Sequence, residues 1–99
     1  MDVNRALRTA VQSGRVLLGG DQTKKAIEKG EAKLIVLASN HPDADGIETT
    51  ASGKGIPVYR YMGRGMELGP AIGKPFSVGA LAVLDAGESD IMGLKKETA

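Results

Sequence analysis

The segment Lys33-Leu-Ile-Val-Leu-Ala-Ser39 is a continuous apolar run between a lysine and a serine. A strand with one face in water alternates apolar and polar side chains, and this segment shows no such alternation. The pattern is therefore typical of a strand that is buried on both faces, with helices packed on each side of its sheet.

The residues at the start of the chain indicate a helix followed by a strand. Apolar residues at helical spacing place the helix near residues 3–13, with Asp2 as its cap and Gly14 at its end. Residues 15–19 are typical of a short buried strand.

A second helix is expected after the glycine pair Gly19 and Gly20. Asp21 or Thr23 is suited to cap its start, because both side chains accept hydrogen bonds from backbone N–H groups. Gly30 suits the left-handed position at its end.

The alternation of strands and helices continues after residue 39. In order, the sequence indicates a weak helix over 47–52, a strand over 56–61, a short helix over 66–72, a strand over 79–85 and one or two helical turns over 88–94. Pro70 is expected to be tolerated only in the first turn of its helix, and Gly73 is suited to end that helix. This order predicts a single α/β domain over residues 1–99, folded as a three-layer α/β/α sandwich.

The composition limits the classes of protein to which the chain can belong. Its 99 residues suffice for one domain, and 41% hydrophobic with 25% charged residues is ordinary for a soluble globular protein. No apolar run approaches the ~20 residues that span a bilayer, and we expect no signal peptide before the first helix. The absence of cysteine excludes disulfides, thiolate nucleophiles and cysteine metal sites. We therefore expect a cytoplasmic protein that makes no membrane contact.

Charge is distributed unevenly along the chain, although the formal net charge is only +1. The balance of Lys and Arg against Asp and Glu is +3 over residues 1–40, −3 over 41–53, +3 over 54–74 and −2 from residue 75 onward. This pattern allows either a basic face on a nearly neutral molecule or solubilising charges that are scattered over the surface.

The turn Gly73-Lys74-Pro75-Phe76-Ser77-Val78-Gly79 carries two apolar side chains at its centre, Phe76 and Val78. Phe76 is also the only phenylalanine of the chain. Turns are usually polar because they lie in water. An apolar turn therefore either folds back onto the core or awaits a partner.

Two further segments carry groups that suit a nucleic acid. Gly19 and Gly20 lie between a strand and a helix, where backbone N–H groups can meet phosphates, and the lysines of that helix add positive charge. Those lysines are Lys24, Lys25 and Lys29. The spacings of a Walker motif and of a dinucleotide-binding fingerprint are both absent.

Asn40 follows the second strand, and its amide offers donors and an acceptor to a base edge. We expect the first, second and fourth strands to run parallel, so that strand ends and the following loops gather at one edge. Charge would hold phosphates there, while Phe76 and Val78 would support an unpaired base. Aromatic residues make up only 3% of the chain, so we expect recognition of RNA shape plus one or two splayed bases.

Residue patterns that are typical of enzymes are weak in this chain. His41 is the only histidine, and a lone histidine in a turn is far more often solvated than catalytic. There is no Gly-x-Ser-x-Gly elbow, and Asp43-Ala-Asp45-Gly46 lacks the remaining ligands of a calcium loop. We therefore expect no catalytic residue, no metal site and no cofactor.

Several short motifs occur in an order that is seen in one family of ribosomal proteins. They are Leu18-Gly19 before a lysine-bearing helix, Ala32-Lys-Leu-Ile-Val-Leu-Ala-Ser-Asn40, Ile56-Pro-Val-Tyr59, Glu67-Leu-Gly69, Gly73-Lys-Pro-Phe76 and Ala80-Leu-Ala-Val-Leu-Asp85-Ala-Gly87-Glu-Ser-Asp-Ile91. Over residues 2–94 the chain resembles the archaeal and eukaryotic large-subunit L-thirty-e proteins, relatives of the kink-turn-binding L-seven-Ae proteins.

The resemblance implies a four-stranded mixed sheet between helices, and binding to a kinked internal loop, or kink-turn, of ribosomal RNA. It also implies neighbouring ribosomal proteins as partners and a monomer when the protein is free. The positions that it matches to RNA contacts are Gly19, Gly20, Lys25, Asn40, Phe76, Val78 and Gly79. Asp21 stands where the family usually has lysine or arginine, and Lys24 is the substitute contact that we expect.

Three other functions remain open. A kink-turn protein of a small-RNA modification particle would use the same fold and surface, although the segment Gly87-Glu-Ser-Asp-Ile91 favours the ribosomal branch. A small-molecule enzyme of α/β architecture would carry a deep pocket at the strand ends. A protein-interaction module would dock through Phe76 and Val78.

Overall fold

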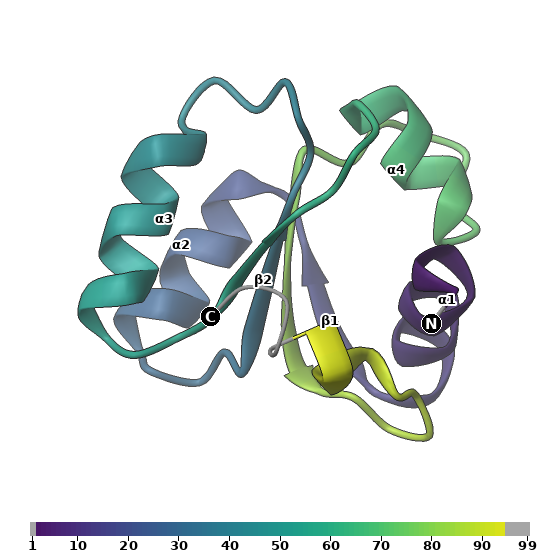
Figure 1. The fold of residues 1–99 in the computed structure, drawn as a ribbon, viewed down its shortest axis with the longest axis horizontal. Coiled ribbons are helices and arrows are strands. Elements are labelled where there is room, and N and C mark those ends of the chain that lie inside the picture. The colour runs from purple at the N-terminus through teal and green to yellow at the C-terminus, as the bar shows by residue number, and fades with distance from the viewer. Residues whose placement is uncertain (1, 95–99) are drawn as a thin grey trace.

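The computed structural model describes residues 2–94, which form an α/β domain with helices on both faces of a sheet (Figure 1). In chain order the elements are α1 (Val3–Ser13), β1 (Arg15–Leu18), α2 (Gly20–Glu28), β2 (Leu34–Leu37), α3 (Ala44–Gly53), β3 (Val58–Arg60), α4 (Gly65–Ala71), β4 (Ala80–Asp85) and the 3₁₀ helix η1 (Ile91–Leu94). Within residues 2–94, no helix has the length and apolar character that crossing a lipid bilayer requires.

The four strands lie in the order β1-β4-β2-β3. β4 is antiparallel to both of its neighbours, whereas β3 is parallel to β2. β1, β2 and β3 therefore run in one direction and β4 in the other, so the prediction that the first, second and fourth strands are parallel is wrong. The connection from β3 to β4 stays at the end of the sheet where β3 finishes, because the Ser39 N–H donates to the Gly63 carbonyl and the Val78 N–H donates to the Gly65 carbonyl. The chain therefore enters β4 from that end.

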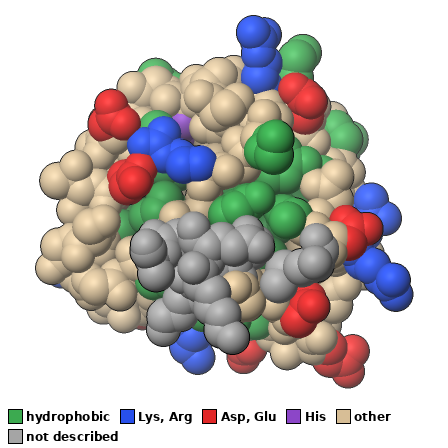
Figure 2. All heavy atoms as spheres, viewed as in Figure 1, with side chains coloured by type: hydrophobic (Ala, Val, Ile, Leu, Met, Phe, Trp, Pro, Cys, Tyr) green, Lys and Arg blue, Asp and Glu red, His purple; other side chains and the backbone are tan. Residues whose placement is uncertain are grey.

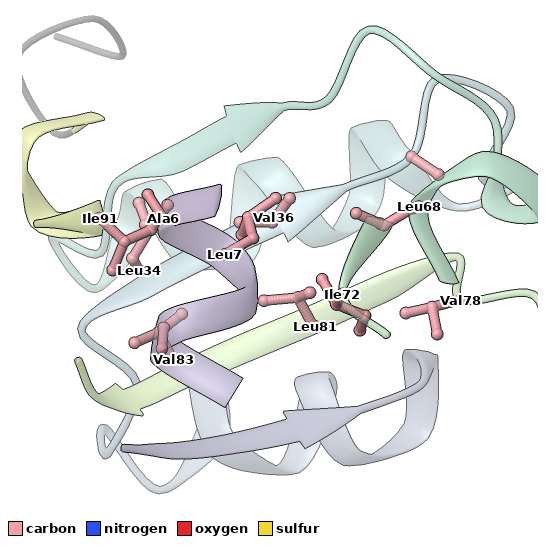
Figure 3. Close-up of a cluster of buried hydrophobic side chains, with 12 residues drawn as sticks. Ala6, Leu7, Leu34, Val36, Leu68, Ile72, Val78, Leu81, Val83 and Ile91 are labelled. Atoms are coloured by element: carbon pink, nitrogen blue, oxygen red, sulfur yellow. The ribbon is translucent and has the colours of Figure 1, made fainter. Parts of the chain in front are cut away.

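β2 lies at the centre of the core. Leu34 and Val36 belong to a cluster with residues of α1 and α4, whereas Ile35 and Leu37 belong to a second cluster with residues of α2 and α3. All four side chains are fully buried. The strand buried on both faces and the three-layer sandwich with a four-stranded mixed sheet are thus confirmed. Figure 3 shows the first cluster, with Leu7 of α1 lying against the sheet.

The first helix begins and ends where the sequence predicts. Its cap is Asp2, whose Oδ1 accepts a hydrogen bond from the Arg5 N–H at 3.2 Å. At the other end, the Gly14 N–H donates to the Ala10 carbonyl at 2.8 Å. β1, which follows, pairs with β4 alone and is exposed or half-buried, where the sequence predicts a buried strand.

The start of α2 differs from the prediction. Gly19, with φ +100°, precedes the helix, and neither Asp21 nor Thr23 caps it. Thr23 is buried and donates its hydroxyl hydrogen to the Gly19 carbonyl at 2.8 Å, while Asp21 lies exposed in the first turn. Gly30 has the left-handed conformation that the sequence predicts, with φ +69°.

Two helices in the second half of the chain also depart from expectation. α3 begins at Ala44 rather than at residue 47, because Ala44, Ile47 and Ala51 bury one helical face in the second cluster. Pro70 lies in the last turn of α4 instead of the first. The short helix tolerates it there because the ring is exposed and only one backbone donor is lost.

Candidate nucleic-acid interface

Three segments that are distant in sequence meet at one edge of the sheet, at the top of Figure 1. They are residues 19–20 after β1, residues 40–41 after β2 and residues 74–79 before β4, and we call them the rim. The rim exists because β4 is antiparallel to β1 and β2. A parallel β4 would begin at the opposite edge and would place residues 74–79 far from the other two segments.

Backbone hydrogen bonds join the segments of the rim. The Gly19 N–H donates to the Ala80 carbonyl at 2.8 Å, which ties the end of β1 to the start of β4. The Ala38 N–H donates to the Gly79 carbonyl at 2.9 Å and ties the end of β2 to the same strand. The rim is therefore an extension of the sheet rather than a set of independent loops.

His41 fills the space between two glycines of the rim. A Cβ atom added at Gly20 would lie 3.2 Å from His41 Nε2, and one added at Gly79 would lie 3.0 Å from His41 Cδ2. The ring is half-buried, and its Nδ1 accepts a hydrogen bond from the Asp43 N–H at 3.1 Å. The sequence predicts a solvated turn residue here, because a lone histidine carries no signal that glycines pack against it.

Asn40 is exposed on the rim and is already held on one side. Its Oδ1 accepts a hydrogen bond from the Gly65 N–H at the start of α4, at 3.0 Å. The amide NH₂ group is the donor that this side chain can still offer to a ligand. An open cleft of about 430 Å³ lies beside it, lined by Asn40, His41, Pro42, Arg64, Gly65, Met66, Ser77 and Gly79.

The two apolar side chains of the 73–79 turn differ in their exposure to solvent. Phe76 is 53% exposed, so it does not cover the core. Val78 is only 2% exposed and packs in the first cluster, to which Leu68 also belongs (Figure 3). Its side chain is therefore folded into the core, where the sequence predicted a side chain that supports an unpaired base. Met66 on α4, 64% exposed and lining the cleft, supplies a second apolar group that sequence analysis missed.

The lysines of α2 are not equivalent. Lys24 is paired with Asp43, with 2.9 Å between Lys24 Nζ and Asp43 Oδ2. The hydrogen bond from Lys24 lowers the pKa of the Asp43 carboxyl, and the same bond raises the pKa of Lys24. Lys25 is exposed in the last turn of α2, and Lys29 follows that turn. Both therefore lie toward the end of the helix away from the rim, whereas the sequence predicted that they lie near its start.

Charges of both signs lie next to each other on the surface. On the face shown in Figure 2, Lys and Arg side chains stand beside Asp and Glu side chains and do not form a continuous basic area. Arg60 of β3 illustrates the arrangement, because its guanidinium pairs with both Asp45 and Glu48. The sequence allowed either a basic face or scattered solubilising charges, and the face shown carries scattered charges.

Comparison with known proteins identifies the relatives of the chain. The model of the ribosomal protein L7Ae/L30e/S12e/Gadd45 family matches residues 1–93. The large ribosomal subunit protein eL30 of Methanospirillum hungatei is 48% identical over 97% of this chain and 100% of its own length. The eL30 protein of Methanocaldococcus jannaschii is 50% identical over 98% of this chain and 92% of its own.

A solved structure shares the fold. A protein of unknown function from Bacillus halodurans superposes with a TM-score of 0.82 and 28% identity, covering 96% of this chain and 97% of that one. The resemblance that the sequence motifs indicated is therefore confirmed over nearly the whole chain, and so is the expectation of a non-catalytic protein. The chain belongs to the ribosomal protein L7Ae/L30e/S12e/Gadd45 family.

Proposed function

We propose that this chain is a structural protein of the large ribosomal subunit, and that it binds a kink-turn-like internal loop of ribosomal RNA. Relatives that match it over nearly their full length are named large ribosomal subunit proteins, which supports the ribosomal assignment. The protein then works in the cytoplasm as part of the ribosome, beside neighbouring ribosomal proteins. It is a monomer before assembly and needs no cofactor.

The observation that carries the RNA-binding part is the position of Asn40 and Phe76 on one edge of the sheet. Between their segments lies an open cleft, which suits splayed nucleotides better than a small enclosed ligand. The Asn40 NH₂ group donates to a base acceptor, and the exposed ring of Phe76 stacks on an unpaired base. Met66 extends the apolar surface.

The remaining contacts are to the RNA backbone. A Cβ atom at Gly19 would have nothing within 4 Å, so a phosphate can approach the main chain closely there. Gly20 and Gly79, against which His41 packs, supply the adjoining backbone contacts. Lys25 in α2 supplies a charge that pairs with phosphate. Because the rim segments are fixed by backbone hydrogen bonds, the protein stabilises the kinked RNA by binding it better than the straight form.

Titration of a fluorescently labelled kink-turn RNA tests this proposal. Asn40→Ala and Phe76→Ala are each expected to weaken binding, with Phe76→Ala costing roughly 5- to 150-fold, as for loss of one stacked base. Lys25→Ala is expected to lower the salt dependence of binding, whereas Lys29→Ala, about one helical turn further from the rim, is the matched control. Unchanged affinity in both Asn40→Ala and Phe76→Ala would remove the rim from the interface.

Sedimentation separates the ribosomal role from the closest alternative. A tagged protein should travel with large ribosomal subunits in a sucrose gradient. Recovery in smaller particles with guide-type RNAs would instead indicate a small-RNA modification particle. Partners that persist after RNase treatment would indicate a protein-interaction module.

A further inference from the structure

The turn that carries Phe76 lies against α4 and is bonded to it at two points. The Lys74 N–H donates to the Gly69 carbonyl at 2.9 Å. The Val78 N–H donates to the Gly65 carbonyl at 3.0 Å. Phe76 stands between these two bonds, so its backbone is held against the helix on both sides.

Close contact at Gly69 makes this packing possible. A Cβ atom at Gly69 would lie 1.7 Å from the Phe76 carbonyl oxygen and 2.9 Å from its carbonyl carbon. Both atoms belong to the backbone, so no side-chain rotation relieves the overlap. One turn earlier, a Cβ at Gly65 would lie 3.3 Å from the Val78 carbonyl oxygen, which is tight but can relax by a small shift.

We propose that Gly69 is a positioning residue of the RNA site, because its missing side chain lets the Phe76 backbone seat on α4 and holds the aromatic ring at the rim. This inference rests on the proposed function. The buried side chain of Val78 anchors the turn two residues later, so the ring is presented in place before RNA arrives. A preformed contact of this kind avoids the cost of ordering the turn on binding.

A graded series of alanine substitutions tests the inference. Gly69→Ala, with the severe overlap, should weaken kink-turn RNA binding most, and its loss should approach that of Phe76→Ala. Gly65→Ala, with the mild overlap, should weaken binding less. Gly53→Ala at the end of α3 is the matched control, because a Cβ there would have nothing within 4 Å, and it should bind like wild type.

A spectroscopic probe separates positioning from loss of stability. Phe76 is the only phenylalanine, so fluorophenylalanine labelling gives a single ¹⁹F resonance. In the free protein that resonance should shift in Gly69→Ala and Gly65→Ala and stay in place in Gly53→Ala. A variant that is merely less stable would keep the native resonance. If Gly69→Ala fails to fold, Gly65→Ala carries the test.

A double variant decides whether Gly69 acts through Phe76. In the Phe76→Ala background, Gly69→Ala should cause no further loss of affinity. The inference would be overturned if the losses of affinity in the double variant were fully additive. It would also be overturned if Gly69→Ala bound like wild type while Phe76→Ala bound more weakly. Either outcome would leave the proposed function standing. Failure of the wild-type protein to bind kink-turn RNA would overturn both.

Discussion

At the residue scale, Asn40 combines a structural role with a proposed binding role. Its Oδ1 accepts the Gly65 N–H and thereby orients the start of α4, while its NH₂ group remains for RNA. Because α4 in turn holds the Phe76 turn, the amide and the aromatic ring belong to one hydrogen-bonded unit. Replacing Asn40 by alanine therefore disturbs more than one contact.

Two substitutions at Asn40 separate these roles. Asn40→Asp keeps an acceptor for Gly65 and loses the donor, so its unfolding free energy should stay near wild type while RNA affinity falls. Asn40→Ala loses both, and it should also lower the unfolding free energy by about 1 kcal/mol. Urea unfolding and RNA titration measure the two quantities. Equal stability of Asn40→Ala and wild type would show that the Gly65 bond contributes nothing.

Asp21 is the second residue whose substitution should affect RNA affinity and protein stability in different ways. It does not cap α2, and its exposed carboxylate in the first turn would repel a nearby phosphate. Asp21→Lys should therefore strengthen RNA binding, at a cost of about 0.3–1 kcal/mol in stability because the helix N-terminus favours negative charge. Titrations at two salt concentrations measure the gain, with Asp21→Asn as the intermediate. Unchanged binding by Asp21→Lys at both salt concentrations would mean that phosphates do not pass this turn.

At the scale of elements, α2 and α3 are linked beside the rim by the Lys24–Asp43 pair. Both side chains are about half exposed, so the pair contributes little to stability. Its larger consequence would be for the proposed RNA binding, because Asp43 would compete with phosphate for the ammonium group of Lys24. Lys24, the substitute RNA contact expected from the sequence, therefore has its charge partly neutralised by Asp43.

Removing the charge of Asp43 should leave the Lys24 ammonium group available to pair with phosphate. Asp43→Asn keeps the shape of the side chain, and it should increase RNA affinity and steepen the dependence of affinity on salt. Lys24→Ala in the same background should cancel both changes. Binding curves over a range of salt concentrations provide the measurement. If Asp43→Asn matches wild type throughout, Lys24 does not contact RNA.

At the scale of the whole molecule, β2 connects the two halves of the core. Its neighbouring residues Leu34 and Ile35 lie in opposite clusters, and each is fully buried. The rim depends on this arrangement, because it consists of strand ends that the two clusters hold in place. The stability of the binding surface is therefore tied to that of the whole sheet.

The two clusters should unfold together. Leu34→Ala and Ile35→Ala should each lower the unfolding free energy by about 2–5 kcal/mol, in a single transition. Circular dichroism and the ¹⁹F resonance of labelled Phe76 should report the same midpoint. Separate midpoints in either variant would show that one half of the sandwich unfolds alone.

Much of the local structure followed from the sequence because it depends on neighbouring residues. The apolar run of β2, the Asp2 cap and the left-handed Gly30 are set by burial pattern, side-chain chemistry and backbone freedom. The extent of α3 was underestimated, since threonine and glycine favour helix weakly and tertiary burial outweighs that preference.

For the candidate site, the sequence by itself supplied the residue types, and the family resemblance supplied their expected roles. Only the tertiary structure decided that β4 runs antiparallel, that Val78 turns inward while Phe76 faces outward, and that His41 packs between Gly20 and Gly79. These outcomes depend on where the connection from β3 to β4 is held and on which distant side chains share the core. No stretch of neighbouring residues encodes such distances, so folding of the whole chain brings the rim together.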